Sequence, residues 1–255
     1  MAFDLNNFVI DRIVRGVALS QKDDSVLFSI NQIQNASLNC ASESADAVDA
    51  LGTPIATFYR AKSAEFSAEN ALFDMSLMAT QLGTKKKVAS AAAKLVVPAM
   101  ETFTVAEGGK YELKHSPKVA PTEIYALNGD STFGTKYAKA TAASATEFSI
   151  ADKTISLPTG VTAGTDMFVM YEYETENAVE VVNSATEFPT GCKFVMEVLG
   201  CDVCDQTNLI YAYVIFNNFK LSPDFDWSVA TDGAHPFSGK AQQDLNFRSL
   251  AAKAA

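Results

Sequence analysis

Three observations predict a mainly β fold, a β-sandwich or barrel with one flanking α-helix. Short runs rich in Val, Ile, Phe and Tyr recur between clusters of Gly, Pro, Asn, Asp and Ser, as strands do between turns. Apolar residues make up 48% of the 255 residues, enough for one large β domain or two small ones. One segment has a helical pattern with start and stop signals.

Twelve segments have the composition of strands. They are 26–30, 37–41, 55–59, 64–67, 101–105, 123–127, 147–150, 154–157, 167–174, 178–182, 194–203 and 209–216. The Asn-Gly pair after Leu127 predicts a hairpin turn, and the Ala-Asp-Lys sequence after Ile150 predicts a turn between two short strands. The order of these segments therefore favours antiparallel hairpins.

Residues 70–83 have the pattern of an amphipathic helix. Asn70 can cap its start, Asp74 lies in its first turn and Gly83 can end it. The apolar residues that fall on one face are Leu72, Met75, Met78, Ala79 and Leu82. We expect this face to cover a sheet, with its methionines filling the core. The Ala-rich residues 88–95 are compatible with either a second helix or an extended arm.

Two of the predicted strands are the most informative about function. In residues 167–176 the period of two places Tyr171 and Tyr173 on one face and Glu172, Glu174 and Glu176 on the other. We interpret the three glutamates as a solvated acidic surface used for passage or contact, because a general acid/base pair would need partners that this strand lacks. The segment 209–216 is apolar on both faces, so we expect the domain or a neighbouring subunit to cover both.

The net charge of −10 argues against a protein that binds nucleic acid through contacts with its phosphates. The imbalance is local: residues 166–205 contain nine acids and one base, whereas residues 84–118 contain seven lysines and three glutamates. This pattern predicts either two solvated faces or head-to-tail contact between identical subunits. In the second case Lys85, Lys86 and Lys87 are the candidate stacking contacts.

Four cysteines leave three possibilities open. Cys201 and Cys204 have the C-x-x-C spacing of zinc knuckles and redox motifs, and Cys192 lies close in sequence. A second C-x-x-C is missing and both histidines are remote, so structural zinc, a disulfide and packed thiols all remain. A bond between Cys201 and Cys204 would close too short a loop to stabilise much. A useful disulfide would join one of them to Cys192 or to another subunit.

Signatures of common enzymes are missing from the sequence. It contains no P-loop, dinucleotide-binding, nucleophile-elbow or zincin motif. We therefore predict no catalytic, cofactor-binding or metal-binding residues. No run approaches the roughly 20 apolar residues of a membrane span, and the start of the chain is polar and acidic where a secretory signal is basic and then apolar. We expect a protein assembled in the cytosol, without a membrane partner.

Several stretches resemble phage major tail tube proteins. Residues 58–74 are similar to the strand pair that runs into a short helix in that family, and residues 218–227 and 232–244 are similar to its closing strands. With the Ser/Thr/Ala-rich middle, 119–173, the likeness spans most of the chain. The phages concerned are long-tailed, contractile or non-contractile.

The resemblance implies a single β-rich, tube-forming domain over residues 1–255, with an arm or loop around 84–120. It also implies hexameric rings that stack into the tail tube of a virion, assembled in the host cytoplasm. The implied partners are other copies of the chain, the tail sheath, baseplate and tail terminator proteins, and viral DNA that passes through the lumen without specific binding. No cofactor is implied. The acidic excess suits a conduit, since like charge discourages DNA from binding its wall.

Two other classes of protein fit the composition. A capsid decoration or surface protein would also be β-rich and would form trimers or monomers on a shell. A carboxylate-dependent hydrolase would need two acids that face each other across a cleft. Rods or rings in negative stain would favour the tube, small closed oligomers the decoration protein, and a monomer with a cleft the enzyme.

Overall fold

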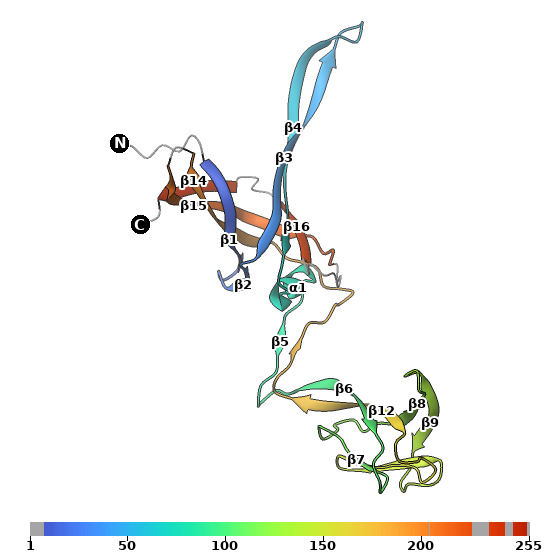
Figure 1. Cartoon of the computed structure of the whole chain (residues 1–255). Coiled ribbons are helices and arrows are strands. Elements are labelled where there is room, and N and C mark those ends of the chain that lie inside the picture. Colours follow the sequence, from blue (N-terminus) through green and yellow to red (C-terminus); the bar gives the residue numbers. More distant parts are fainter. Residues whose placement is uncertain (1–7, 204, 226–234, 243–246, 254–255) are drawn as a thin grey trace. The chain divides into compact units, whose positions relative to one another are not determined.

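The computed structural model describes residues 8–203, 205–225, 235–242 and 247–253, and Figure 1 shows the arrangement of its elements. The strands are β1 (Phe8–Ser20), β2 (Val26–Ile30), β3 (Ile33–Val48), β4 (Pro54–Asn70), β5 (Lys87–Val88), β6 (Leu95–Thr104), β7 (Lys110–Glu112), β8 (Glu123–Leu127), β9 (Phe133–Lys139), β10 (Glu147–Ala151), β11 (Thr154–Ser156), β12 (Asp166–Thr175), β13 (Val179–Glu180), β14 (Cys192–Asp202), β15 (Asp205–Leu221), β16 (His235–Ala241) and β17 (Phe247–Lys253). The one helix in these residues is α1 (Met75–Gln81). The predicted mainly β class with a single helix is therefore confirmed, and the ring assembly stays a prediction.

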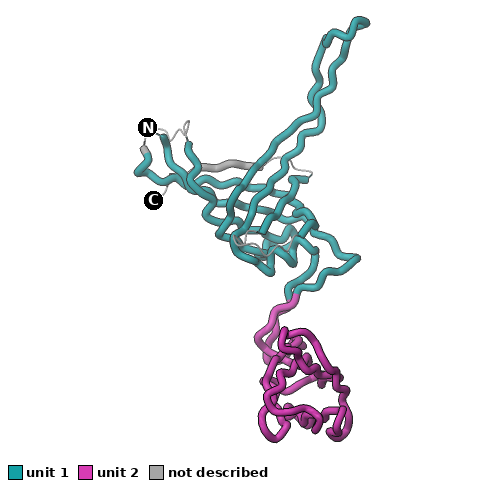
Figure 2. Tube along the Cα trace, turned by 45° about the vertical axis from the view of Figure 1, so that its right-hand side comes forward, with its two compact units in different colours: residues 1–86, 181–255 teal, residues 87–180 magenta. Residues whose placement is uncertain are grey.

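The chain divides into two compact units, which Figure 2 distinguishes by colour. Unit 1 comprises residues 1–86 and 181–255, and unit 2 comprises residues 87–180. The sequence predicts one domain with an arm or loop around 84–120, whereas most of that segment belongs to a folded unit with its own core. The two ends of unit 2 pair with each other, Lys87 with Glu180 and Val88 with Val179, so they lie side by side.

Unit 1 is built on an eight-stranded sheet in the order β2-β1-β14-β15-β16-β4-β3, with β17 paired beside β15. Its core is rich in phenylalanine. The buried rings are Phe28, Phe66, Phe194, Phe216, Phe219 and Phe237. Phe66 occupies the centre, since its ring centroid lies 5.9–6.3 Å from those of four other rings. Tilted and edge contacts of this kind add to the burial of apolar area that stabilises the unit.

The segment 209–216 lies in β15, between β14 and β17. Ile210 and Phe216 are buried, residues 211–215 are half-buried and Leu209 is exposed. One face of the segment is therefore only partly covered within the chain. Its cover by a neighbouring subunit stays a prediction.

Helix α1 begins later than its sequence pattern indicates. Asp74 is its N-cap, and its carboxylate accepts two backbone N–H groups of the first turn at 2.8 and 2.7 Å. The predicted cap, Asn70, is instead the buried last residue of β4, because β3 and β16 both pair with it there. Gly83 ends the helix as predicted: its φ is +72°, and a Cβ would lie 2.3 Å from the carbonyl carbon of Phe188.

Strands β3 and β4 form a long hairpin, of which only the part near Asn70 pairs with the rest of the sheet. The pairing runs from Ile33 opposite Asn70 to Val48 opposite Pro54. Figure 1 shows this hairpin extending well beyond the other strands of unit 1. Residues 34–63 are all exposed, so the distal part has solvent on both faces. The strand predicted at 37–41 lies in β3, and those predicted at 55–59 and 64–67 both lie in β4.

Unit 2 contains a seven-stranded sheet in the order β6-β12-β8-β9-β10-β11-β7 and the short ladder of β13 with β5. Ile124, Phe148, Ile155, Met167 and Val169 are fully buried in its core. The turns predicted after residues 127 and 150 join β8 to β9 and β10 to β11, as expected. The helix considered for 88–95 is wrong, because this segment holds a tight turn and the first residue of β6.

Candidate assembly surfaces

The distal part of the β3–β4 hairpin presents large apolar side chains to solvent. They are Val48, Leu51, Ile55, Phe58 and Tyr59, of which Leu51 is 91% and Tyr59 74% exposed. A two-stranded hairpin without a covered face is at best marginally stable in water. Phe58 and Tyr59 are consecutive in β4, so apolar side chains are exposed on both faces of the hairpin, as is typical of an element that binds a partner.

The tip of this hairpin is a defined turn. The carboxylate of Asp49 accepts the backbone N–H groups of Leu51 and Thr53 at 2.9 and 2.8 Å. These hydrogen bonds hold the pKa of Asp49 below its usual value, and the bond from the backbone N–H of Thr53 makes the largest contribution. Gly52 provides the positive φ, +85°, that closes the turn. The tip is therefore organised before any partner binds, which lowers the entropic cost of binding.

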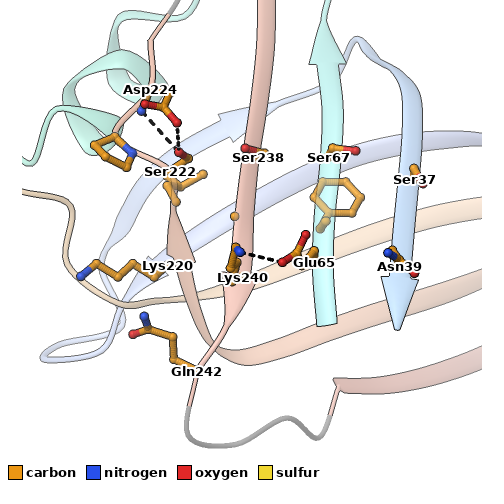
Figure 3. Close-up of a pocket in the computed structure, with 14 residues that line it drawn as sticks. Ser37, Asn39, Glu65, Ser67, Lys220, Ser222, Asp224, Ser238, Lys240 and Gln242 are labelled. Carbon is orange, nitrogen blue, oxygen red and sulfur yellow. Dashed lines mark hydrogen bonds and ion pairs between the residues drawn. The ribbon is translucent and has the colours of Figure 1, made fainter. Parts of the chain in front are cut away.

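A polar groove of about 640 Å³ crosses β3, β4, β16 and β15 at the base of the hairpin (Figure 3). Its side chains form two cross-strand rows, Ser37–Ser67–Ser238 and Asn39–Glu65–Lys240–Lys220. Lys240 contacts Glu65 at 2.6 Å, and the hydroxyl of Ser222 donates to Asp224 at 2.7 Å. Each carboxylate of the groove is therefore engaged, and the surface presents mainly hydroxyl and amide groups to water.

The basic and acidic regions of the sequence meet inside unit 2. Their ion pairs are Lys87–Glu180 at 2.9 Å, Lys94–Glu176 at 3.6 Å and Lys118–Glu174 at 2.9 Å. The sequence predicts two solvated faces or contact between subunits; at these three exposed pairs the two regions lie against each other within one chain, and the contact between subunits stays a prediction. The antiparallel pairing of β5 with β13 and of β6 with β12 brings the two regions together. Each exposed pair contributes no more than about 1 kcal/mol.

The remaining charged candidates lie at the surface. Glu172 and Glu174 are on the exposed face of β12 and Glu176 follows it, so the predicted division of faces is confirmed. Lys85 is exposed, and the ammonium of Lys86 donates to the hydroxyl of Ser76 at 2.7 Å. The passage or contact role of the glutamates and the stacking role of the lysines stay predictions.

The cysteines do not form the internal bond considered between Cys192 and Cys201. Both are free thiols on β14, nine positions apart, which at about 3.3 Å per residue separates them by about 30 Å. Cys192 is fully buried, and burial raises the pKa of its thiol to about 12. Cys40 is an exposed free thiol on the hairpin. Cys204 lies outside the described residues, and a bond to another subunit stays a prediction.

Sequence reasoning missed the hairpin as a site. The signal was available: between residues 39 and 47 every residue of β3 is small or polar, so neither face of the strand can be a core face. Among the described residues, no group of three or more His, Cys, Asp or Glu side chains could hold a metal ion. Across the same part of the chain, no helix has the length and apolar character needed to cross a membrane.

Comparison with known proteins identifies a family over nearly the whole chain. The model of the YomU/Tube protein family matches residues 8–253. This range includes all of unit 2, the hairpin and nearly all of unit 1. No curated protein matches the sequence.

Proposed function

The chain belongs to the YomU/Tube protein family, and from this premise we propose that it is the structural subunit that stacks as rings to form the tube of a phage tail. The proposed rings are hexameric, and the tube is the conduit through which DNA leaves the virion. Assembly takes place in the host cytoplasm. The first partner of each chain is another copy of itself, and the ends and outside of the tube contact terminator, baseplate and sheath proteins.

The exposed β3–β4 hairpin is the observation that carries the proposal. A chain that acts alone gains no stability from thirty consecutive exposed residues, 34–63, which include six exposed large apolar side chains. Burial of these side chains against another copy stabilises both the hairpin and the assembly. A hairpin that binds elsewhere on the next copy makes a heterologous contact, which closes into a ring or propagates into an open stack according to the rotation between copies.

The charge pattern supports the same assembly. Of the candidate stacking lysines, Lys87 contacts Glu180 and Lys86 donates to Ser76 within the chain, so we assign the contact between rings first to Lys85. The net charge of −10 opposes adhesion of DNA to the lumen. The polar groove beside the hairpin offers DNA no aromatic side chain to stack on except Phe66, which is buried.

A shortened hairpin tests the proposal. Residues 42–62 are replaced by Asn-Gly, which joins Ala41 to Ser63 through a two-residue turn where these residues already pair. We expect the far-ultraviolet circular dichroism of a folded β protein, with rods lost in negative stain. Rods of normal length from this variant would overturn the proposal.

A charge-matched pair of variants tests whether the apolar side chains of the hairpin are needed for rod formation. Leu51→Asp with Phe58→Asp removes apolar contact area, whereas Ser44→Asp with Thr57→Asp adds the same charge at exposed polar positions. We expect the first variant to abolish rods and the second to retain them. Trimers or monomers in the unmodified protein would favour the decoration protein or the hydrolase instead.

A further inference from the structure

The turn between β8 and β9 contains the one Asn-Gly pair of the sequence, Asn128-Gly129. In such a pair the glycine adds no side chain that would shield its backbone nitrogen, so this nitrogen can attack the neighbouring carboxamide. Residues 128–133 are all exposed, and no atom lies within 4 Å of the position that a Cβ on Gly129 would take. Water therefore has free access to the pair.

Deamidation of Asn128 needs no reactant except water. The backbone nitrogen of Gly129 gives its proton to solvent and forms a bond to Cγ of Asn128. The bond from Cγ to Nδ2 breaks, and ammonia leaves with a proton taken from water. A water molecule then opens the cyclic succinimide at either carbonyl, which leaves aspartate or isoaspartate at position 128.

The folded turn restrains each part of Asn128 that this reaction must move. Its backbone N–H donates to the carbonyl oxygen of Thr132 at 2.9 Å, and its own carbonyl accepts the N–H of Ser131 at 2.8 Å. Its carboxamide Nδ2 donates to the hydroxyl of Thr132 at 2.9 Å. The attack requires rotation about the backbone and side-chain bonds of Asn128, so these hydrogen bonds oppose it.

Two neighbours support the carboxamide in this position. The hydroxyl of Thr132 donates to the carboxylate of Asp130 at 2.6 Å, so its lone pairs are left to accept from Asn128. The backbone N–H of Thr132 donates to the same carboxylate at 3.1 Å. Gly134 leaves room for the carboxamide, since a Cβ there would lie 2.8 Å from Oδ1 of Asn128.

We propose that Asn128 is a site of spontaneous deamidation in this chain, and that the hydroxyl of Thr132 slows the reaction while the turn is folded. The inference needs no second copy of the chain and is independent of the proposed function. Aspartate at position 128 adds a negative charge close to Asp130. Isoaspartate lengthens the backbone inside the turn, so the paired bonds of Asn128 with Ser131 and Thr132 cannot both be kept.

Incubation of the full chain at mildly alkaline pH, folded or unfolded in urea, tests the proposal. Tryptic digestion under mildly acidic conditions gives the peptide 119–136, which reports on residue 128 alone because it contains no other asparagine and no glutamine. Mass spectrometry then measures the converted fraction over time. We expect conversion in urea and at least about tenfold slower conversion in the folded chain, as loss of several hydrogen bonds predicts. Equal rates, or no conversion in urea, would overturn the proposal.

Matched variants of the folded chain isolate the hydroxyl of Thr132. Thr132→Val should speed conversion by about two- to tenfold, which corresponds to one neutral hydrogen bond, whereas Thr132→Ser keeps a hydroxyl and should restore the slow rate. Thr135→Val makes the same change at an exposed position of the same hairpin and should leave the rate unchanged.

Gly134→Ala provides an independent check, because it displaces the carboxamide without altering Thr132 and should also speed conversion. Circular dichroism confirms that each variant is folded. Equal rates in Thr132→Val and Thr135→Val would show that Thr132 does not protect Asn128.

Discussion

At the scale of single residues, Glu101 is the buried acid whose hydrogen bonds join several segments of unit 2. It is buried, and its carboxylate accepts the hydroxyls of Tyr171 and Tyr111 at 2.5 and 2.7 Å and the backbone N–H of Lys114 at 3.1 Å. Burial by itself raises the pKa of Glu101, but these hydrogen bonds outweigh it and hold the pKa below the usual value of 4.5. Burial and the hydrogen bond to Glu101 raise the pKa of Tyr111 to about 12.

We predict that Glu101→Gln destabilises unit 2 by about 1–3 kcal/mol at pH 7, because a neutral amide cannot accept all three donors. The folded-state pKa lies below the unfolded one, so the carboxylate contributes its full stability above about pH 4.5 and loses it as the pH falls toward the folded pKa. Thermal unfolding between pH 7 and pH 3 measures both effects. The acid-induced loss should be smaller in the variant, and Glu107→Gln, in an exposed turn, is the control. An unchanged melting curve for Glu101→Gln would refute this account.

At the scale of elements, α1 depends on its cap because it has only seven residues. So short a helix is not stable by propensity, and the two hydrogen bonds to Asp74 together with the burial of Leu77 hold it in place. Asp74→Ala should cost about 1 kcal/mol. For a chain of this size that lowers the melting temperature by about 2–4 °C. Asp74→Asn, which keeps an acceptor, should melt close to the unmodified protein, and equal losses in both variants would contradict the capping role.

The β3–β4 hairpin has two parts that differ in burial. Its proximal part alternates buried and exposed residues, as in Ala64, Glu65 and Phe66, and this alternation fixes its register on the sheet. Its distal part has no buried face, so cross-strand pairing and the turn at Asp49 alone define its conformation. The change occurs at residue 64, which marks where the core of unit 1 ends and the proposed contact surface begins.

At the scale of the whole molecule, unit 2 is an insertion whose ends meet. Lys87 and Glu180 pair through their backbones and through their side chains, and the core of unit 1 contains no residue of unit 2. We predict that replacement of residues 87–180 by Gly-Ser-Gly leaves unit 1 folded and able to form rods. Circular dichroism and negative stain check this. An insoluble or unfolded product would show that unit 1 needs the insertion to fold.

The sequence by itself determined the features that depend on neighbouring residues. The period of two located most strands and assigned Glu172 and Glu174 to the exposed face of β12. The Asn-Gly pair after Leu127 lies in the turn between β8 and β9, and Gly83 ends α1 with a positive φ, which is a local property of glycine. The single helix and the mainly β class follow from the same short-range patterns.

Only the tertiary structure decided the features that join distant residues. Three features depend on which strands meet: the division into two units, the single long hairpin made from three predicted strands, and the pairing of Lys87 with Glu180 across 93 positions. The same holds for the carboxylate of Glu101, whose partner Tyr171 is 70 positions away. A strand pattern fixes which face of a strand is apolar but not which strand it pairs with, because backbone hydrogen bonds are the same for every sequence. The partner is selected by the packing of the whole core, and that selection placed the acidic and basic regions of this chain against each other.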